Sequence, residues 1–78
     1  MKPKRKKTAL VTGGSSGIGR CTASALSQSG YTVYEFSRRD IPIKGVKHMS
    51  VDVTNEASVQ AAVEQILRER GSIEILVN

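Results

Sequence analysis

The stretch TGGSSGIG, residues 12–19, decides the fold of this 78-residue chain. It follows an apolar run at residues 9–11 and leads into a segment whose apolar residues recur at helical spacing. The glycines therefore lie where a strand turns into a helix. Such a turn is typical of a loop that holds a nucleotide pyrophosphate, because free N–H groups and the positive end of the helix dipole face the anion.

Three glycines carry this prediction. We expect a positive φ at Gly13, which lets the chain turn sharply off the strand. Gly17 lets the backbone approach the phosphates, since a side chain would fill their place, and Gly19 lets the helix pack closely on the strand. The alternative is a plain turn and helix cap rich in Gly and Ser. The other predicted residues of the phosphate-binding loop are Ser15, Ser16 and Ile18.

A phosphate-loop NTPase is the nearest rival, because Gly14 and Gly19 have the required spacing. That motif continues with Lys and then Ser or Thr, which reach the terminal phosphates and magnesium. Here the next two residues are Arg20 and Cys21. The chain therefore lacks the side chains that a phosphate-loop NTPase needs at these two positions.

The rest of the chain alternates between short apolar runs and amphipathic segments. We predict strands at about residues 8–12, 32–37, 46–51 and 73–77, and helices at about residues 18–29 and 55–70. This alternation indicates an α/β fold with a parallel sheet and right-handed crossovers. We expect Thr54 to cap the second helix, and Gly30 and Gly71 to end the two helices. The predicted core face of the first helix comprises Ile18, Cys21, Thr22, Ala25 and Leu26, and that of the second comprises Val59, Ala62, Val63, Ile66 and Leu67.

The connection between the second and third strands is unusually short. Only about eight residues, 38–45, join them, and Pro42 is among them. A parallel crossover normally takes about ten or more residues and usually a helix. We therefore expect that helix to be lost or reduced to a turn, which leaves one face of the sheet thinly covered.

With these motifs the chain resembles the short-chain dehydrogenase/reductase family. Residues 12–19 match its cofactor motif, Asp52-Val53-Thr54 is similar to its adenine-pocket motif, and residues 74–78 are similar to the strand that leads into its Asn-Asn-Ala-Gly motif. Of that last motif only the first Asn, Asn78, is present. The resemblance covers nearly everything from Thr8 onward. It implies a partial Rossmann-like doubly wound parallel sheet with four strands in the order 3-2-1-4 and two main helices.

The resemblance also assigns roles to residues. Asp52 would accept a hydrogen bond from the adenine amino group, Val53 would border the ring, and Asn78 would lie near the adenosine ribose. Taken alone, an Asp before Val-Thr is more often a residue at the start of a helix. That alternative stays open here.

The end of the second strand predicts the cofactor. An NAD site has an Asp or Glu there for the ribose 2′-hydroxyl, whereas this chain has Ser37 followed by two arginines. A guanidinium binds a 2′-phosphate that a carboxylate would repel. We therefore predict NADP, with Arg38 on the 2′-phosphate and Ser37 as a second donor. NAD remains the alternative, because Asp40 has nearly the right sequence distance and the family's other NADP marker is replaced by Ser16.

No catalytic or metal-binding residue is predicted. The Ser, Tyr and Lys on which the family's hydride transfer relies, and its supporting Asn, all lie beyond the position that matches Asn78. Neither Tyr31 nor Tyr34 is followed by Lys four residues later, so we interpret both as packing residues. His48 has no Cys or carboxylate cluster around it in the sequence and is interpreted as an ordinary strand residue.

The net charge of +5 comes from the N-terminus. Five of the twelve basic residues precede Thr8, and from there on seven basic residues balance seven acidic ones. We interpret residues 1–7 as a basic tail and residues 8–78 as the first part of a dinucleotide-binding domain, with neither nucleic acid nor membrane as partner. No apolar run approaches the roughly 20 residues of a membrane span. The single cysteine, Cys21, predicted to be in the core, suits a reducing cytoplasm.

Three functions remain open at this stage. The first is the N-terminal NADP-binding segment of an oxidoreductase that transfers hydride between NADP(H) and a carbonyl or hydroxyl substrate, with the catalytic part missing from this chain. The second is a stand-alone dinucleotide-binding or regulatory module without catalysis. The third is a half-fold that serves only as an interaction surface. We also expect self-association, because the outer edge of the fourth strand is unpaired.

Overall fold

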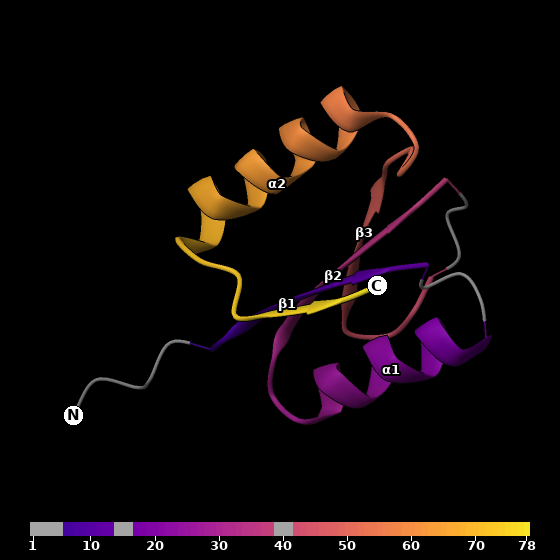
Figure 1. Ribbon diagram of the computed structural model, residues 1–78. Coiled ribbons are helices and arrows are strands. Elements are labelled where there is room, and N and C mark those ends of the chain that lie inside the picture. Colours follow the sequence, from indigo (N-terminus) through magenta and orange to yellow (C-terminus); the bar gives the residue numbers. More distant parts are fainter. Residues whose placement is uncertain (1–5, 14–16, 39–41) are drawn as a thin grey trace.

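The computed structural model describes residues 6–13, 17–38 and 42–78, and it has the alternating order expected (Figure 1). All strand pairs are parallel, and the sheet order is β3-β2-β1-β4. The predicted partial doubly wound fold is thus confirmed. The elements are β1 (Thr8–Thr12), α1 (Gly17–Gln28), β2 (Thr32–Ser37), β3 (Val46–Ser50), α2 (Glu56–Arg70) and β4 (Ile75–Val77).

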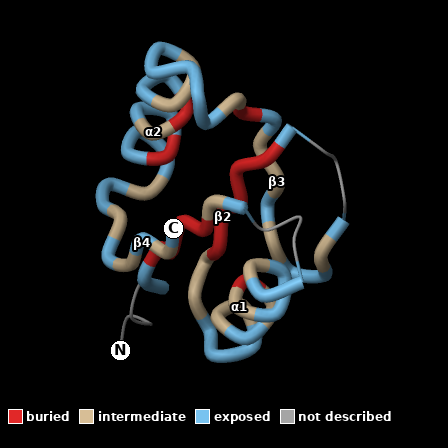
Figure 2. The backbone as a smooth tube through the Cα atoms, turned by 45° about the vertical axis from the view of Figure 1, so that its right-hand side comes forward, coloured by how far each residue is buried: buried red, intermediate tan, exposed pale blue. Residues whose placement is uncertain are grey.

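The two helices lie on opposite faces of the sheet (Figure 1) and divide its apolar residues into two clusters. Alternate residues of each strand point to opposite faces, so neighbouring strand positions serve different helices. Figure 2 shows the buried positions concentrated in the sheet, with the outward sides of the helices exposed. The cluster beneath α2 contains Leu10, Tyr34, Phe36, Val51, Ala62 and Ile66, and that beneath α1 contains Ala9, Val11, Ala23 and Val33.

The predicted core face of α1 is wrong in part. Ala23 is fully buried and Leu26 packs against the same cluster, whereas Ile18 is 85% exposed and Cys21 is exposed. The helix therefore turns Ala23 and Leu26 toward the sheet, whereas Ile18 and Cys21, which were expected there, lie on its outer side. A short side chain such as Ala23 lets the helix lie close to β1 and β2.

The start of α2 also differs from the prediction. Asn55, not Thr54, is the N-cap, and its side chain accepts a hydrogen bond from the Ser58 N–H at 3.1 Å. The Thr54 side chain is engaged with Asp52 instead. Gly71 ends the helix as expected, with a φ of 89° that favours glycine.

The short link between β2 and β3 has no helix in its described residues, 38 and 42–45. Ile43 closes part of the gap by packing against the α1-side cluster. At the other edge of the sheet, β4 is shorter than predicted, and its Leu76 is 66% exposed. Neither described helix is long and apolar enough to cross a membrane.

Candidate functional site

A cavity of about 190 Å³ opens where β2 and β3 end. It brings together five residues that the sequence predicted for a cofactor site, from three separate segments. The carboxyl ends of parallel strands meet at one edge of a sheet, which is where doubly wound sheets bind ligands. The lining residues are Gly13, Phe36, Ser37, Arg38, Val51, Asp52, Val53 and Thr54.

Asp52 is held in place by the chain that follows it. Its Oδ1 accepts hydrogen bonds from the Thr54 hydroxyl at 2.6 Å and from the Thr54 N–H at 3.0 Å. These two bonds, helped by the positive charge of Arg38, lower the pKa of Asp52 below its usual value of 3.8. Asp52 therefore shapes the turn into α2 and also presents an ionised carboxylate to the cavity, so the two sequence interpretations are compatible.

Arg38 is exposed on the other wall of this cavity, at the end of β2. Ser37, the last residue of β2, is buried, with a relative exposure of 9%. The cavity thus places a cation and a carboxylate, Arg38 and Asp52, within electrostatic reach of each other. A ligand that enters it meets both charges.

Gly13 and Gly17 of the motif differ in why a glycine is needed. Gly13 has a φ of 73°, as predicted, and its N–H donates to the Phe36 carbonyl at 3.3 Å, which fixes the turn against β2. Gly17 opens α1 without a positive φ, and a Cβ built there would meet no atom of the other described residues within 4 Å, apart from its chain neighbour and the backbone of its own helix turn. The fold itself therefore does not require glycine at position 17.

Two predicted residues of the loop, Ser15 and Ser16, lie outside the described residues, as do Arg39 and Asp40. Ile18 projects into open surroundings rather than into the core. Gly19 is partly buried in the first turn of α1, four residues before the buried Ala23, on the side that faces the sheet.

Asn78 follows β4 and lies apart from the lining of the cavity. The Thr12 hydroxyl donates to Asn78 Oδ1 at 2.8 Å, so the ends of β1 and β4 are tied together beside the glycine turn. Thr12 was not named as a site residue, and neither were Phe36, Val51 and Thr54 of the cavity wall. Thr12 and Thr54 belong to the two motifs quoted from the sequence, and Phe36 and Val51 lie at or next to predicted strand ends, so these were the signals that could have found them.

His48 is paired with a buried carboxylate. Its Nδ1 lies 2.7 Å from Oε1 of Glu35, which is 1% exposed, and the two residues are register partners on β3 and β2. Glu35 Oε2 and His48 Nε2 are buried and have no hydrogen-bond partner in the part of the chain that the structure describes. Among the described residues no group of three or more His, Cys, Asp or Glu side chains could hold a metal ion.

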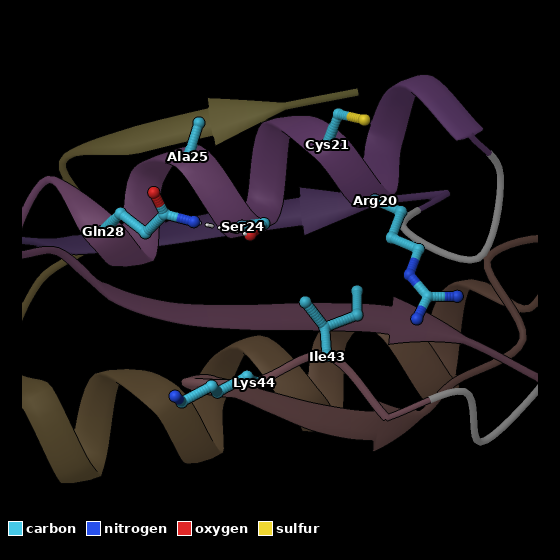
Figure 3. Close-up of a pocket in the computed structure, with 7 residues that line it drawn as sticks. All are labelled: Arg20, Cys21, Ser24, Ala25, Gln28, Ile43 and Lys44. Atoms are coloured by element: carbon cyan, nitrogen blue, oxygen red, sulfur yellow. Dashed lines mark hydrogen bonds between the residues drawn. The ribbon is translucent and has the colours of Figure 1, made fainter.

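A larger groove, of about 390 Å³, runs along the flank of α1 (Figure 3). The short β2–β3 link forms its other wall. Arg20 and Lys44 supply positive charge, and none of the described residues that line it is acidic. Its full lining is Arg20, Cys21, Ser24, Ala25, Gln28, Ile43 and Lys44.

Comparison with known proteins agrees with this geometry. The family model described as short chain dehydrogenase matches residues 7–78. The chain belongs to the short-chain dehydrogenase family. Members of this family use NAD or NADP. The match takes in both the glycine turn and the residues that wall the cavity.

Individual relatives of the family are similar along most of the chain. A 3-ketodihydrosphingosine reductase of Bacteroides thetaiotaomicron is 49% identical over 70 residues, 88% of this chain. A 3-oxoacyl-[acyl-carrier-protein] reductase of Staphylococcus aureus is 36% identical over 87 residues, 96% of this chain. The ligand-free aldohexose dehydrogenase of Thermoplasma acidophilum superposes with a TM-score of 0.89, at 40% identity over 95% of this chain.

The chain spans only part of the length of these short-chain dehydrogenases. The matched region is 26% of the Bacteroides reductase, 35% of the Staphylococcus reductase and 29% of the Thermoplasma structure. The chain thus corresponds to the N-terminal part of such enzymes.

Proposed function

We propose that this chain is the NADP-binding segment of a short-chain dehydrogenase/reductase. The pyrophosphate would lie at the turn between β1 and α1, and the adenosine in the cavity between the ends of β2 and β3. The observation that carries the proposal is the convergence of Gly13, Arg38 and Asp52 on one cavity beside the start of α1. The open space at Gly17 supports it, because that space is what a phosphate would need.

The preference for NADP over NAD rests on the end of β2. No carboxylate stands at Ser37, where an NAD site has one, and the neighbouring Arg38 is exposed and lines the cavity. A guanidinium binds a phosphomonoester with charge-assisted hydrogen bonds. We therefore assign Arg38 to the 2′-phosphate, Ser37 to a supporting bond, and Asp52 and Val53 to the adenine.

The activity proposed for the whole enzyme is hydride transfer between NADP(H) and a carbonyl or hydroxyl substrate. Two of the relatives are named as reductases of 3-keto compounds, which favours a ketone as the oxidised substrate. Tyr34 is not available for proton transfer to a substrate, because it is buried and its hydroxyl donates to Glu69 at 2.7 Å, although Lys47 Nζ lies over its ring at 5.4 Å from the centroid. We propose that residues 8–78 bind the cofactor and leave catalysis to the rest of the enzyme.

Two further parts of the proposal concern the cellular compartment of the protein and the self-association of the chain. The exposed, unpaired thiol of Cys21 fits a reducing compartment, which favours the cytoplasm. The isolated chain would self-associate through β4, whose apolar residues contrast with the charged Lys47 on the opposite edge strand. Charges on an edge strand oppose pairing with other chains, and β4 has none.

A nuclear magnetic resonance titration of the ¹⁵N-labelled chain with NADPH tests the proposed function. We expect the largest amide shifts at Gly13, Gly17 and the segment 52–54, with a weak affinity because much of a complete enzyme is absent. Shifts confined to other surfaces, or no shifts at millimolar NADPH, would contradict it. Submicromolar binding would favour a stand-alone dinucleotide-binding module.

A further inference from the structure

A buried polar pair, Glu35 and His48, lies on the α1 side of the sheet and has no part in the proposed cofactor contacts. Glu35 on β2 is 1% exposed, and the side chain of its register partner His48 on β3 is 17% exposed. Oε1 of Glu35 lies 2.7 Å from Nδ1 of His48. Alternate strand positions share a face, so Glu35 lies on the same face as Val33 of the apolar cluster beneath α1. Its register partner on β1, Val11, is also buried and apolar.

Stability alone does not account for this pair. A carboxylate loses its solvation when it is buried, and a well-packed apolar pair of similar volume is often at least as stable as a buried ion pair. In addition, Oε2 of Glu35 and Nε2 of His48 have no hydrogen-bond partner among the described residues. A buried polar contact can instead fix the register of the elements that it joins, because its hydrogen bond holds in one alignment only. The chemistry of the pair therefore points to the register of β3 on β2.

This register matters because β3 leads directly into the cavity at the strand ends. Two residues beyond the pair, Ser37 and Ser50 are register partners, and the Val51 N–H donates to the Ser37 carbonyl at 3.1 Å. Asp52 is the next residue along the chain. A slip of one residue would turn every side chain of β3 to the opposite face of the sheet. The position of Asp52 across the cavity from Arg38 thus depends on how β3 aligns with β2.

The surroundings of β3 do less to hold this alignment. It is an edge strand of the described sheet (Figure 1), and the link that precedes it has no helix in its described residues. On the α2 side, Lys47 Nζ lies 5.4 Å from the centroid of the Tyr34 ring, but Lys47 is exposed. Exposed cation–π contacts are weak. The hydrogen bond between Glu35 and His48 is buried and directional, so it fixes the alignment more closely.

We propose that Glu35 and His48 are positioning residues for the adenosine half of the cofactor. Their hydrogen bond fixes β3 on β2 so that Asp52 meets the adenine amino group. Neither residue lines the cavity, so both act through Asp52 and not by touching the dinucleotide. This inference rests on the proposed dinucleotide-binding function, and it does not depend on the 2′-phosphate.

The test uses NADP⁺ and its hypoxanthine analogue, which has an oxygen in place of the adenine amino group, in nuclear magnetic resonance titrations of the chain. The decisive variant is Glu35→Val/His48→Val, which replaces the pair by β-branched residues that suit strands and leaves no buried charge. It should weaken NADP⁺ binding about fivefold and change binding of the analogue less than about twofold. Glu35→Gln, whose amide can still hydrogen-bond to His48, should retain most of the NADP⁺ affinity. The matched control is Lys47→Thr, an exposed position on the other face of β3, which should leave both affinities unchanged.

The two nucleotides distinguish positioning from a merely structural effect. Wild-type NADP⁺ affinity in the double variant overturns the role of the pair, and so do equal losses for NADP⁺ and the analogue. Circular dichroism verifies the fold of each variant. If the double variant is unfolded, His48→Thr replaces it with the same expected losses, because a shorter side chain at this partly exposed position lets water reach Glu35. A wild-type chain that binds neither nucleotide overturns the proposed function, whereas one that binds both equally overturns this inference alone.

Discussion

At the scale of single residues, we propose that the end of β2 determines whether the site accepts NADP or NAD. Arg38 is exposed, lines the cavity and faces a carboxylate that its own turn keeps ionised. A 2′-phosphate would be attracted by Arg38 and repelled by Asp52, so in the proposed binding mode the adenine lies between the phosphate and that carboxylate. The proposal therefore gives the two residues distinct partners on the same ligand.

This division of roles makes Arg38→Ala selective. In the full-length enzyme that contains this segment, we expect the substitution to weaken NADPH binding by roughly 1.5–3 kcal/mol, the range of a hydrogen bond to a charged group. NADH binding should change little, because its 2′-hydroxyl carries no charge. Fluorescence titration with each cofactor measures both values, and an equal loss for the two would refute the assignment.

At the scale of elements, the positions of helices and strands were predicted well from the sequence. The sides that they bury were predicted less well. Thr8–Thr12 and Thr32–Ser37 have the predicted bounds, because apolar runs between turn residues define them. The burial of α1 was misjudged because hydrophobicity favoured Ile18 and Cys21, whereas close packing on a sheet selects Ala23. That selection depends on the distance between helix and sheet, which a single sequence does not contain.

The candidate site was likewise predictable from the sequence only in part. The residues that share the cavity, Ser37, Arg38 and Asp52, were predictable because each ends or follows a strand of a parallel sheet. The capping of α2 was not, because Thr54 and Asn55 are both good caps. Only the structure shows that Asp52 engages the Thr54 hydroxyl, which leaves Asn55 to cap the helix.

Paired substitutions in α1 test which side of this helix is buried. Ala23→Leu should destabilise the chain by about 1–3 kcal/mol, since extra methylenes have no space beneath the helix. Cys21→Leu, on the exposed side, should change stability by less than about 0.5 kcal/mol. Urea unfolding followed by circular dichroism gives both free energies. The reverse order would mean that the sequence-based helix face was right.

At the scale of the whole molecule, the two edges of the sheet are unlike. The β3 edge carries Lys47 and His48, whereas β4 presents the apolar residues 75–77, with Leu76 66% exposed. An uncharged edge strand with an exposed leucine is a template for pairing with another chain. We therefore place the self-association proposed for the isolated chain at the β4 edge of the sheet.

Leu76→Lys should shift the isolated chain from associated species toward monomer in sedimentation velocity at micromolar concentration. The lysine opposes edge-to-edge pairing and removes exposed apolar area. As a control, Leu67→Lys changes another partly exposed leucine, on α2, and should leave the assembly unchanged. A wild-type chain that is already a stable monomer would contradict the association.

The central claim, that a dinucleotide lies against the turn between β1 and α1, is tested most directly at Gly17. We predict that Gly17→Val abolishes NADPH binding in a calorimetric titration, because the side chain enters the space proposed for the pyrophosphate. The fold should persist, since Gly17 has no positive φ and a Cβ there meets no atom within 4 Å. Ala25→Val, at an exposed position of the same helix, is the matched control and should retain binding. Retained NADPH binding by a folded Gly17→Val chain would show that the pyrophosphate lies elsewhere.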